Sequence, residues 1–139
     1  MILLDTSGLL AALIRTERGH EAAQSVLESE ERPLVLSPFV LAELDYFVSR
    51  HLGAVGEAAL LAEVERDVYS LAGFGAADVG EAARVIDAHA EMGIGLADAS
   101  LVVLAGRYGT NRVLTLDERH FRALRTPAGK PFTILPADA

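Results

Sequence analysis

The sequence contains no cysteine, which excludes disulfide bonds and metal sites built from thiolates but leaves the cellular compartment open. It also lacks an apolar run long enough to span a bilayer, because charged residues interrupt each run. No basic segment precedes the first apolar stretch, so we expect no signal peptide and a cytoplasmic protein without membrane contact. Repeats, low-complexity tracts and linkers are missing, and residues 1–139 fit a single domain.

Basic residues are scarce over most of the chain, and the net charge is −8. Residues 1–100 contain 17 acidic and 6 basic side chains, whereas residues 101–139 contain 3 acidic and 6 basic ones. The basic end is either a solvated helix face or a phosphate-binding patch on an acidic body. The arginines that could form such a patch are Arg107, Arg112, Arg119 and Arg122.

Short apolar runs alternate with helical patterns along the whole chain. The predicted strands cover residues 2–4, 34–36, 68–71, 112–116 and 132–135. The predicted helices cover residues 9–14, 19–30, 38–52, 57–67, 76–91, 96–108 and 118–121. Strands separated by helices imply parallel β-α units and a three-layer α/β/α sandwich. Right-handed crossovers then bring the carboxyl end of every strand to one edge of the sheet.

Two aspartates directly follow predicted strands. Asp5 ends the run Ile2–Leu4, and Asp117 ends the run 112–116. Both are therefore expected at the carboxyl edge of the sheet, where open α/β sheets bind ligands. Each could instead cap the helix that follows it, a position that aspartate favours.

Glu43 is unusual because its helical neighbours are apolar. Phe39, Val40 and Phe47 lie three or four residues away, so the helix 38–52 is expected to place Glu43 along an apolar face. An unpaired carboxylate is costly there, and the alternative is a buried salt bridge to an arginine. Asp45 is two positions further on and is expected to point to solvent.

Asp98 lies in the first turn of the strongly apolar helix 96–108. The helix dipole favours an exposed acid in the first turn, but a helix this apolar is expected to be buried. Clustered carboxylates repel one another and resist ionising together, and a hard divalent cation relieves the repulsion. Mg²⁺ and Mn²⁺ prefer oxygen ligands and can activate water near a phosphate, which favours phosphodiester hydrolysis.

These motifs resemble the PIN-domain ribonucleases, in particular the VapC toxins of bacterial toxin–antitoxin pairs. The resemblance spans essentially the whole chain and rests on segments 5–7, 41–44, 96–99 and 115–121, which read DTS, LAEL, LADA and TLDERHF. It implies a parallel sheet of four to five strands in the order 3-2-1-4-5. In that order the strands that carry Asp5 and Asp117 are neighbours at the topological switch point.

The resemblance also implies roles for particular residues. Asp5, Glu43 and Asp98 would bind Mg²⁺ or Mn²⁺, and Asp117 would be a more variable fourth ligand. Thr6 and Thr115 would be supporting hydroxyl groups that orient the carboxylates. The implied activity is endonucleolytic hydrolysis of RNA, and the implied partners are a second copy of the chain and a cognate antitoxin protein.

Two other functions compete with this hypothesis. The same fold could be a non-catalytic protein-interaction module, with its acids used as caps and salt bridges. The chain could also be a phosphatase of the haloacid dehalogenase type. That family needs a second aspartate two residues after the first, and this sequence has Ser7 there, which disfavours the phosphatase. The histidines show no paired metal-ligand spacing and are expected to be structural or exposed; they are His20, His51, His89 and His120.

Overall fold

The computed structural model describes residues 1–139 and contains one five-stranded parallel sheet in the order β3-β2-β1-β4-β5. This order confirms the predicted topology. The strands are β1 (Ile2–Leu4), β2 (Leu34–Leu36), β3 (Ser70–Leu71), β4 (Arg112–Leu114) and β5 (Thr133–Leu135). The helices are α1 (Thr6–Leu13), α2 (His20–Ser29), α3 (Pro38–Glu65), α4 (Ala76–Ala88), α5 (Leu96–Tyr108) and α6 (Glu118–Ala123), and a single 3₁₀ turn covers Ala90–Met92.

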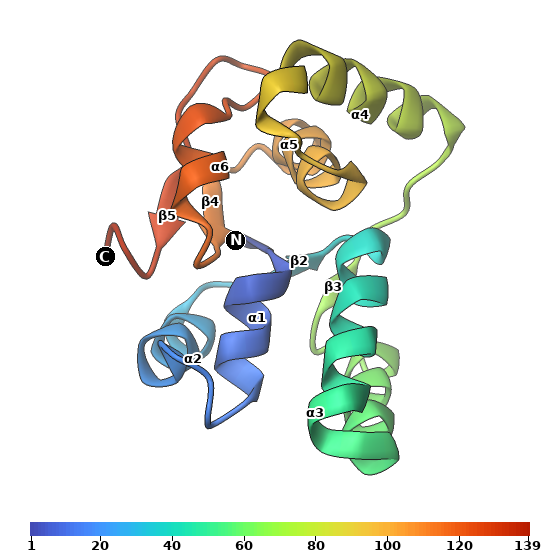
Figure 1. Ribbon diagram of the computed structural model, residues 1–139, viewed down its shortest axis with the longest axis vertical. Coiled ribbons are helices and arrows are strands. Elements are labelled where there is room, and N and C mark those ends of the chain that lie inside the picture. The colour runs from blue at the N-terminus through green and yellow to red at the C-terminus, as the bar shows by residue number, and fades with distance from the viewer.

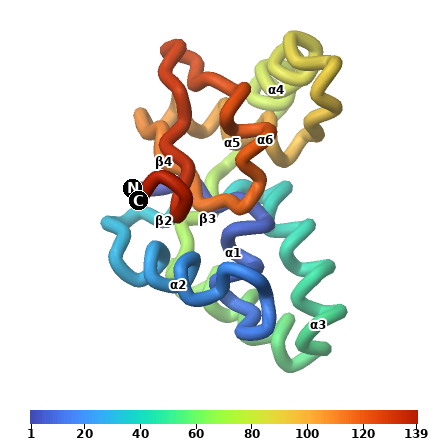
Figure 2. The backbone as a smooth tube through the Cα atoms, turned by 60° about the vertical axis from the view of Figure 1, so that its left-hand side comes forward, coloured from blue at the N-terminus to red at the C-terminus, as the bar shows by residue number.

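The sheet lies between two layers of helices (Figure 1). Helices α1, α2 and α3 lie on one side of the strands, and α4, α5 and α6 lie on the other side, an arrangement that Figure 2 also shows after rotation. Right-handed crossovers require this division, because the chain moves from β1 out to β3 and then returns past β1 to β4. The central strands β1 and β2 are completely buried because helices cover both of their faces.

Several elements differ from prediction at their ends. Helix α1 begins at Thr6, directly after Asp5, and not at residue 9 as predicted. Strands β3 and β4 are shorter than the apolar runs that predicted them. The helix predicted over residues 76–91 ends at Ala88, and a 3₁₀ turn follows it. None of the helices combines the length and the apolar character that a membrane crossing requires.

Helix α3 is a helical hairpin, as the two predicted helices indicated. Gly53 interrupts it with φ of 69° and ψ of −168°, a backbone conformation that is open to glycine and strained for other residues. The second segment lies behind the first in Figure 1 and leads back to the sheet at β3. The first segment packs into the core through Val40, Leu44 and Val48 and lies along one side of the carboxyl edge of the sheet.

A pair of buried serines joins the starts of α3 and α5. Ser100 Oγ donates to the carbonyl oxygen of Ala97 at 2.6 Å, so the Ser37 hydroxyl donates across the 2.7 Å contact to Ser100 Oγ. Ser37 Oγ also accepts the backbone N–H of Phe39 and caps α3. Two helices that are 63 residues apart in sequence are thereby held together beside the carboxyl edge.

The first turn of α1 packs directly against the end of β4. A Cβ atom at Gly8 would lie 2.4 Å from the carbonyl oxygen of Leu114, well inside the contact limit. The same carbonyl oxygen accepts the backbone N–H of Asp5 at 3.0 Å. Only glycine permits this approach, which brings the residue after β1 next to the residue after β4.

We expect Gly8→Ala to lower the free energy of unfolding by about 1–3 kcal/mol, because the new methyl group meets backbone that cannot move aside. Urea denaturation of the metal-free protein measures the change. Gly80→Ala is the matched control: Gly80 lies inside α4, where a Cβ atom would come no closer than 3.8 Å to the Arg84 guanidinium, and alanine there should stabilise the protein by up to about 1 kcal/mol. Equal stability of Gly8→Ala and wild type would contradict the steric argument.

Candidate active site

Asp5 occupies the position before α1, yet its carboxylate makes no hydrogen bond that caps the helix. Its Oδ2 atom accepts the Thr115 hydroxyl at 2.7 Å and the Ser7 hydroxyl at 3.3 Å. The residue is 6% exposed, and burial raises the pKa of its carboxyl to about 6. The Thr115 hydrogen bond lowers this pKa and the negative charge of Asp98 raises it further. A nearby positive charge would therefore stabilise the ionised form.

Two hydroxyl groups connect the loop after β4 to the start of α1. Ser7 Oγ and Thr115 Oγ1 lie 3.1 Å apart. Ser7 Oγ accepts the N–H of Leu116 at 2.9 Å, and Thr115 Oγ1 accepts the N–H of Asp117 at 2.9 Å. These bonds fix the position of Asp117 relative to Asp5. Ser7 was not among the predicted site residues, and its place two residues after Asp5 was the only signal in the sequence.

Glu43 reaches the site from the first segment of α3, where Thr6 Oγ1 donates to its Oε1 atom at 2.7 Å. Glu43 is exposed, so the prediction that it lies along a buried apolar face is wrong; this turn of α3 borders an open cavity. The prediction for Asp45 is also wrong, because its Oδ1 atom is buried without a partner. Asp45 faces Glu57 across the helical hairpin, and the hydrogen bond between them raises the pKa of Glu57.

Asp98 and Asp117 meet at a histidine. Nδ1 of His120 lies 3.0 Å from Asp98 Oδ2 and 3.0 Å from Asp117 Oδ2. Burial raises the pKa of Asp98, and His120 opposes this shift. Asp117 is also the N-cap of α6, since its Oδ1 accepts the backbone N–H of His120 at 3.3 Å, so the capping alternative describes part of its role.

His120 corrects the expectation that every histidine is structural or exposed, because it contacts two of the candidate metal ligands. Its side chain is 15% exposed, and Nε2 is buried without a hydrogen-bond partner. The signal in the sequence was the spacing of three residues from Asp117 in the first turn of a helix, which places both side chains on one face.

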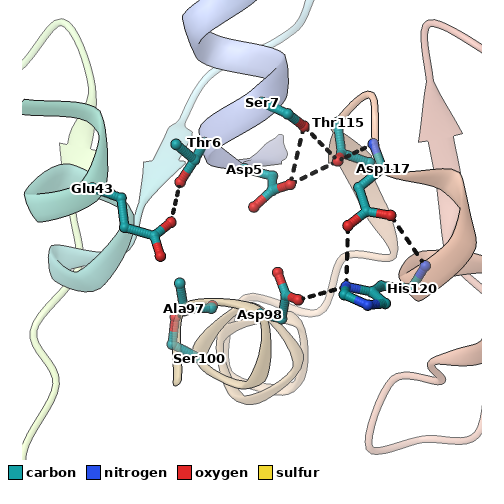
Figure 3. Close-up of polar contacts among 10 residues, drawn as sticks. All are labelled: Asp5, Thr6, Ser7, Glu43, Ala97, Asp98, Ser100, Thr115, Asp117 and His120. Carbon is teal, nitrogen blue, oxygen red and sulfur yellow. Dashed lines mark hydrogen bonds and ion pairs between the residues drawn. The ribbon is translucent and has the colours of Figure 1, made fainter. Parts of the chain in front are cut away.

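The four predicted acids face one another across a single cavity, as Figure 3 shows. Asp5 comes from the end of β1, Glu43 from α3, Asp98 from α5 and Asp117 from the loop after β4. The cavity has a volume of about 680 Å³. Its lining consists of Asp5, Thr6, Ser7, Leu10, Ala42, Glu43, Tyr46, Phe47, Asp98 and Asp117, without a lysine or arginine.

The predicted arginine patch does not assemble around this cavity. Arg112 lies at the start of β4, opposite the carboxyl edge, and forms a two-pronged ion pair with Glu30. Arg107 pairs with Asp78 at 2.8 Å, and Arg122 pairs with Asp138 and Glu118. Arg119 is exposed on α6 and forms no ion pair.

The donor set fits a hard divalent cation. Carboxylate oxygens dominate it, and ligand atoms of Asp98, Asp117 and His120 lie within 4.8 Å of one another, close enough to share one ion. The raised pKa of Asp5 is a further sign that its carboxylate lacks a partner of opposite charge. Without such a partner, ionising all four acids in one cavity is unfavourable.

The sheet order and the acids at its switch point define a known class of domain. The chain belongs to the PIN-domain family, because the family model described as PIN domain matches residues 2–126. Among its relatives is ribonuclease VapC26 from Mycobacterium tuberculosis strain ATCC 25618/H37Rv. The two proteins are 44% identical over 135 residues, which cover 97% of this chain and 100% of that protein.

Solved structures share the fold at low sequence identity. VapC20 from Mycobacterium tuberculosis, a toxin that cleaves the Sarcin-Ricin loop, matches with a TM-score of 0.79 and 20% identity over 86% of this chain and 92% of that one. VapBC2 from Rickettsia felis, bound to a DNA fragment from their promoter, matches with a TM-score of 0.66 and 19% identity over 96% and 98%. These structures confirm the predicted fold.

The raised pKa of Asp5 predicts how stability depends on pH when no metal is present. Its folded pKa of about 6 exceeds the ordinary value of 3.8, so its contribution is fully present below pH 3.8 and is lost as the pH rises through 6. We therefore expect wild type to lose about 3 kcal/mol relative to Asp5→Asn between pH 4 and about pH 8.

Urea denaturation with a chelator present, at several pH values, measures this difference. Asp87→Asn is the control, since Asp87 is exposed on α4 away from the cavity and should follow wild type at every pH. Parallel curves for wild type and Asp5→Asn would show that Asp5 is not the group that titrates.

Proposed function

We propose that this protein is a metal-dependent endoribonuclease that acts as the toxin of a toxin–antitoxin pair. The observation that carries the proposal is the convergence of four carboxylates from four separate elements on one cavity at the switch point of the sheet (Figure 3). Carboxylates in this arrangement are suited to hold divalent cations against a phosphodiester. VapC26 is a ribonuclease and VapC20 is a toxin that cleaves the Sarcin-Ricin loop, and these two relatives support RNA as the substrate.

Asp5, Glu43 and Asp98 would hold Mg²⁺ or Mn²⁺, with Asp117 and His120 beside them. Such an ion supplies polarisation of the scissile phosphate and a lowered pKa for an attacking water. The protein supplies orientation. Thr115 holds the Asp5 carboxylate, and Thr6 holds that of Glu43.

The absence of basic residues from the cavity lining has a chemical consequence. An RNA phosphate brought to four carboxylates is repelled unless cations lie between them. Binding of the reacting phosphate is therefore expected to depend on the divalent ion, rather than on lysine or arginine contacts at the site. Of the four arginines considered above, only Arg119 forms no ion pair. Arg119 is therefore the proposed phosphate contact outside the cavity.

The partners proposed for this chain are a cognate antitoxin protein and a second copy of itself. The resemblance to the VapC toxins implies both, and the VapBC2 structure shares the fold over nearly the whole chain. An antitoxin that inhibits the enzyme would have to cover the carboxylate cavity or deny RNA access to it. The strongly acidic body over residues 1–100 suits a partner segment rich in basic residues.

Metal binding and cleavage test the proposal together. Mn²⁺ should raise the thermal midpoint of wild type and do much less for Asp98→Asn, because a ligand that binds only the folded state stabilises it. The rate of cleavage of a mixed-sequence RNA with Mn²⁺ should be at least about 100-fold lower in Asp98→Asn than in wild type. Removing an outer-shell partner of a metal ligand already costs up to about 100-fold in activity, and Asp98 is proposed to bind the ion directly. Asp87→Asn should match wild type in both assays.

The outcomes separate the two functions considered for this fold. Stabilisation by Mn²⁺ with RNA cleavage supports the nuclease. If Mn²⁺ shifts the midpoint of neither protein and neither cleaves RNA, the acids are not a metal site and the non-catalytic interaction module is the correct function.

A further inference from the structure

Two aromatic side chains lie exposed on the wall of the carboxylate cavity. Tyr46 is 54% exposed and Phe47 is 38% exposed, and both line the cavity together with the acids. Their ring centroids are 5.4 Å apart and their planes are inclined at 78°. Large aromatic rings usually bury most of their surface, so two open rings beside a polar cavity indicate a surface that binds something.

The rings continue a stripe that starts at a proposed metal ligand. Tyr46 and Phe47 are three and four residues after Glu43, and Arg50 is four residues after Tyr46. At these spacings the four side chains occupy one face of α3. The Arg50 guanidinium carbon lies 5.2 Å from the centre of the Tyr46 ring, and Arg50 forms no ion pair. The stripe thus runs from a carboxylate, over two aromatic rings, to a free positive charge.

This sequence of groups matches the chemistry of a single RNA strand. Helix α3 contributes Ala42, Glu43, Tyr46 and Phe47 to the wall of the cavity. A strand whose phosphate lies at the carboxylates and that leaves the cavity past α3 crosses these rings. Bases stack on aromatic rings in proteins that bind single strands, and arginine contacts the phosphates between them. The cavity lining offers no cation of its own, so uncharged stacking is the attraction available to the nucleotide beside the cleaved bond.

We infer that Tyr46 and Phe47 form a stacking platform for an unpaired base next to the cleaved phosphate, with Arg50 as the contact for a further phosphate. The inference rests on the proposed nuclease function and adds the residues that would bind the base beside the cleaved bond. A paired base is already stacked within its duplex and offers the rings no free face.

Single-turnover cleavage of a labelled, unstructured RNA oligonucleotide tests the platform with Mn²⁺ present. Equilibrium binding with Mn²⁺ uses the same oligonucleotide with a non-hydrolysable linkage at the cleaved bond, because wild type would otherwise cut the RNA during the measurement. The variant Tyr46→Leu/Phe47→Leu keeps apolar bulk but removes the rings. We expect the Kd of this variant for RNA, and the enzyme concentration that half-saturates single-turnover cleavage, to rise by about 5- to 100-fold. The maximal rate of cleavage should change by less than about twofold. The thermal midpoint and its Mn²⁺ shift should stay unchanged.

Two controls separate stacking from general apolar contact. Tyr46→Phe/Phe47→Tyr keeps both rings and should retain wild-type affinity. Val55→Ala changes an apolar side chain on α3 that is 84% exposed but lies outside the cavity lining, and it should also match wild type.

An abasic scan of the oligonucleotide, in which one base at a time is removed, then tests which base the two rings bind. Removing the base next to the cleaved phosphate should weaken binding to wild type by the same factor as the double leucine substitution. It should have no further effect on the double leucine variant, because the interaction is already lost.

Arg50→Gln tests the phosphate contact. Loss of one phosphate contact should reduce the slope of log affinity against log salt by about 0.7 for a single strand. Arg15→Gln changes an exposed arginine outside the cavity lining and should leave the slope unchanged.

The failures of the two proposals are distinguishable. Wild-type RNA affinity in the double leucine variant overturns the platform even if cleavage continues, and it assigns the exposed rings to a protein partner. Loss of RNA affinity in Tyr46→Phe/Phe47→Tyr as well as in Tyr46→Leu/Phe47→Leu would also overturn stacking, because the first of these variants keeps both rings. Binding that depends on the rings without any cleavage would support the platform and count against the nuclease. Absence of RNA binding by wild type with Mn²⁺ overturns the platform.

Discussion

Repulsion among four carboxylates in one cavity is the constraint around which this fold is arranged. Three of the four acids are held by a hydroxyl or an imidazole from another element: Thr115 for Asp5, Thr6 for Glu43 and His120 for Asp98. Lysine or arginine at those positions would satisfy the carboxylates and exclude other cations. The hydroxyl donors at Asp5 and Glu43 orient the oxygens and leave most of their charge for a divalent ion. The protein thus accepts a less stable site when no metal is bound.

The supports of the site also hold the architecture together. Thr6 connects α1 to α3, Ser37 and Ser100 connect α3 to α5, and Thr115 connects β4 to β1. Gly8 permits the close approach of α1 to β4 on which the last of these contacts depends. Changes to these small residues therefore affect stability and site geometry at once, which explains why so many of them gather at the carboxyl edge.

The resemblance to the PIN-domain ribonucleases implied the strand order, whereas the shared edge of Asp5 and Asp117 follows from chain order. Strands that alternate with helices must be parallel, and Asp5 and Asp117 directly follow their strands. What the sequence could not predict depends on contacts between distant segments. Glu43 was expected to be buried, but an open cavity beside α3 exposes it. His120 lacked a metal-binding pattern of its own and gains its place from Asp98, which lies 22 residues earlier. Arg107, Arg112 and Arg122 were candidates for a phosphate-binding patch. Each instead pairs with an acidic side chain, which is Asp78, Glu30 and Asp138 respectively.

The pairing of β1 with β4 also sets the time at which the site can exist. Asp5 is made 110 residues before the Thr115 hydroxyl that holds it. Chains are synthesised from the amino terminus, and contacts between distant segments form late in folding. A growing chain therefore lacks the fourth carboxylate and the support for the first until Thr115 and Asp117 have been made. A nuclease built on this fold stays inactive during translation until β4 and the loop after it have been synthesised.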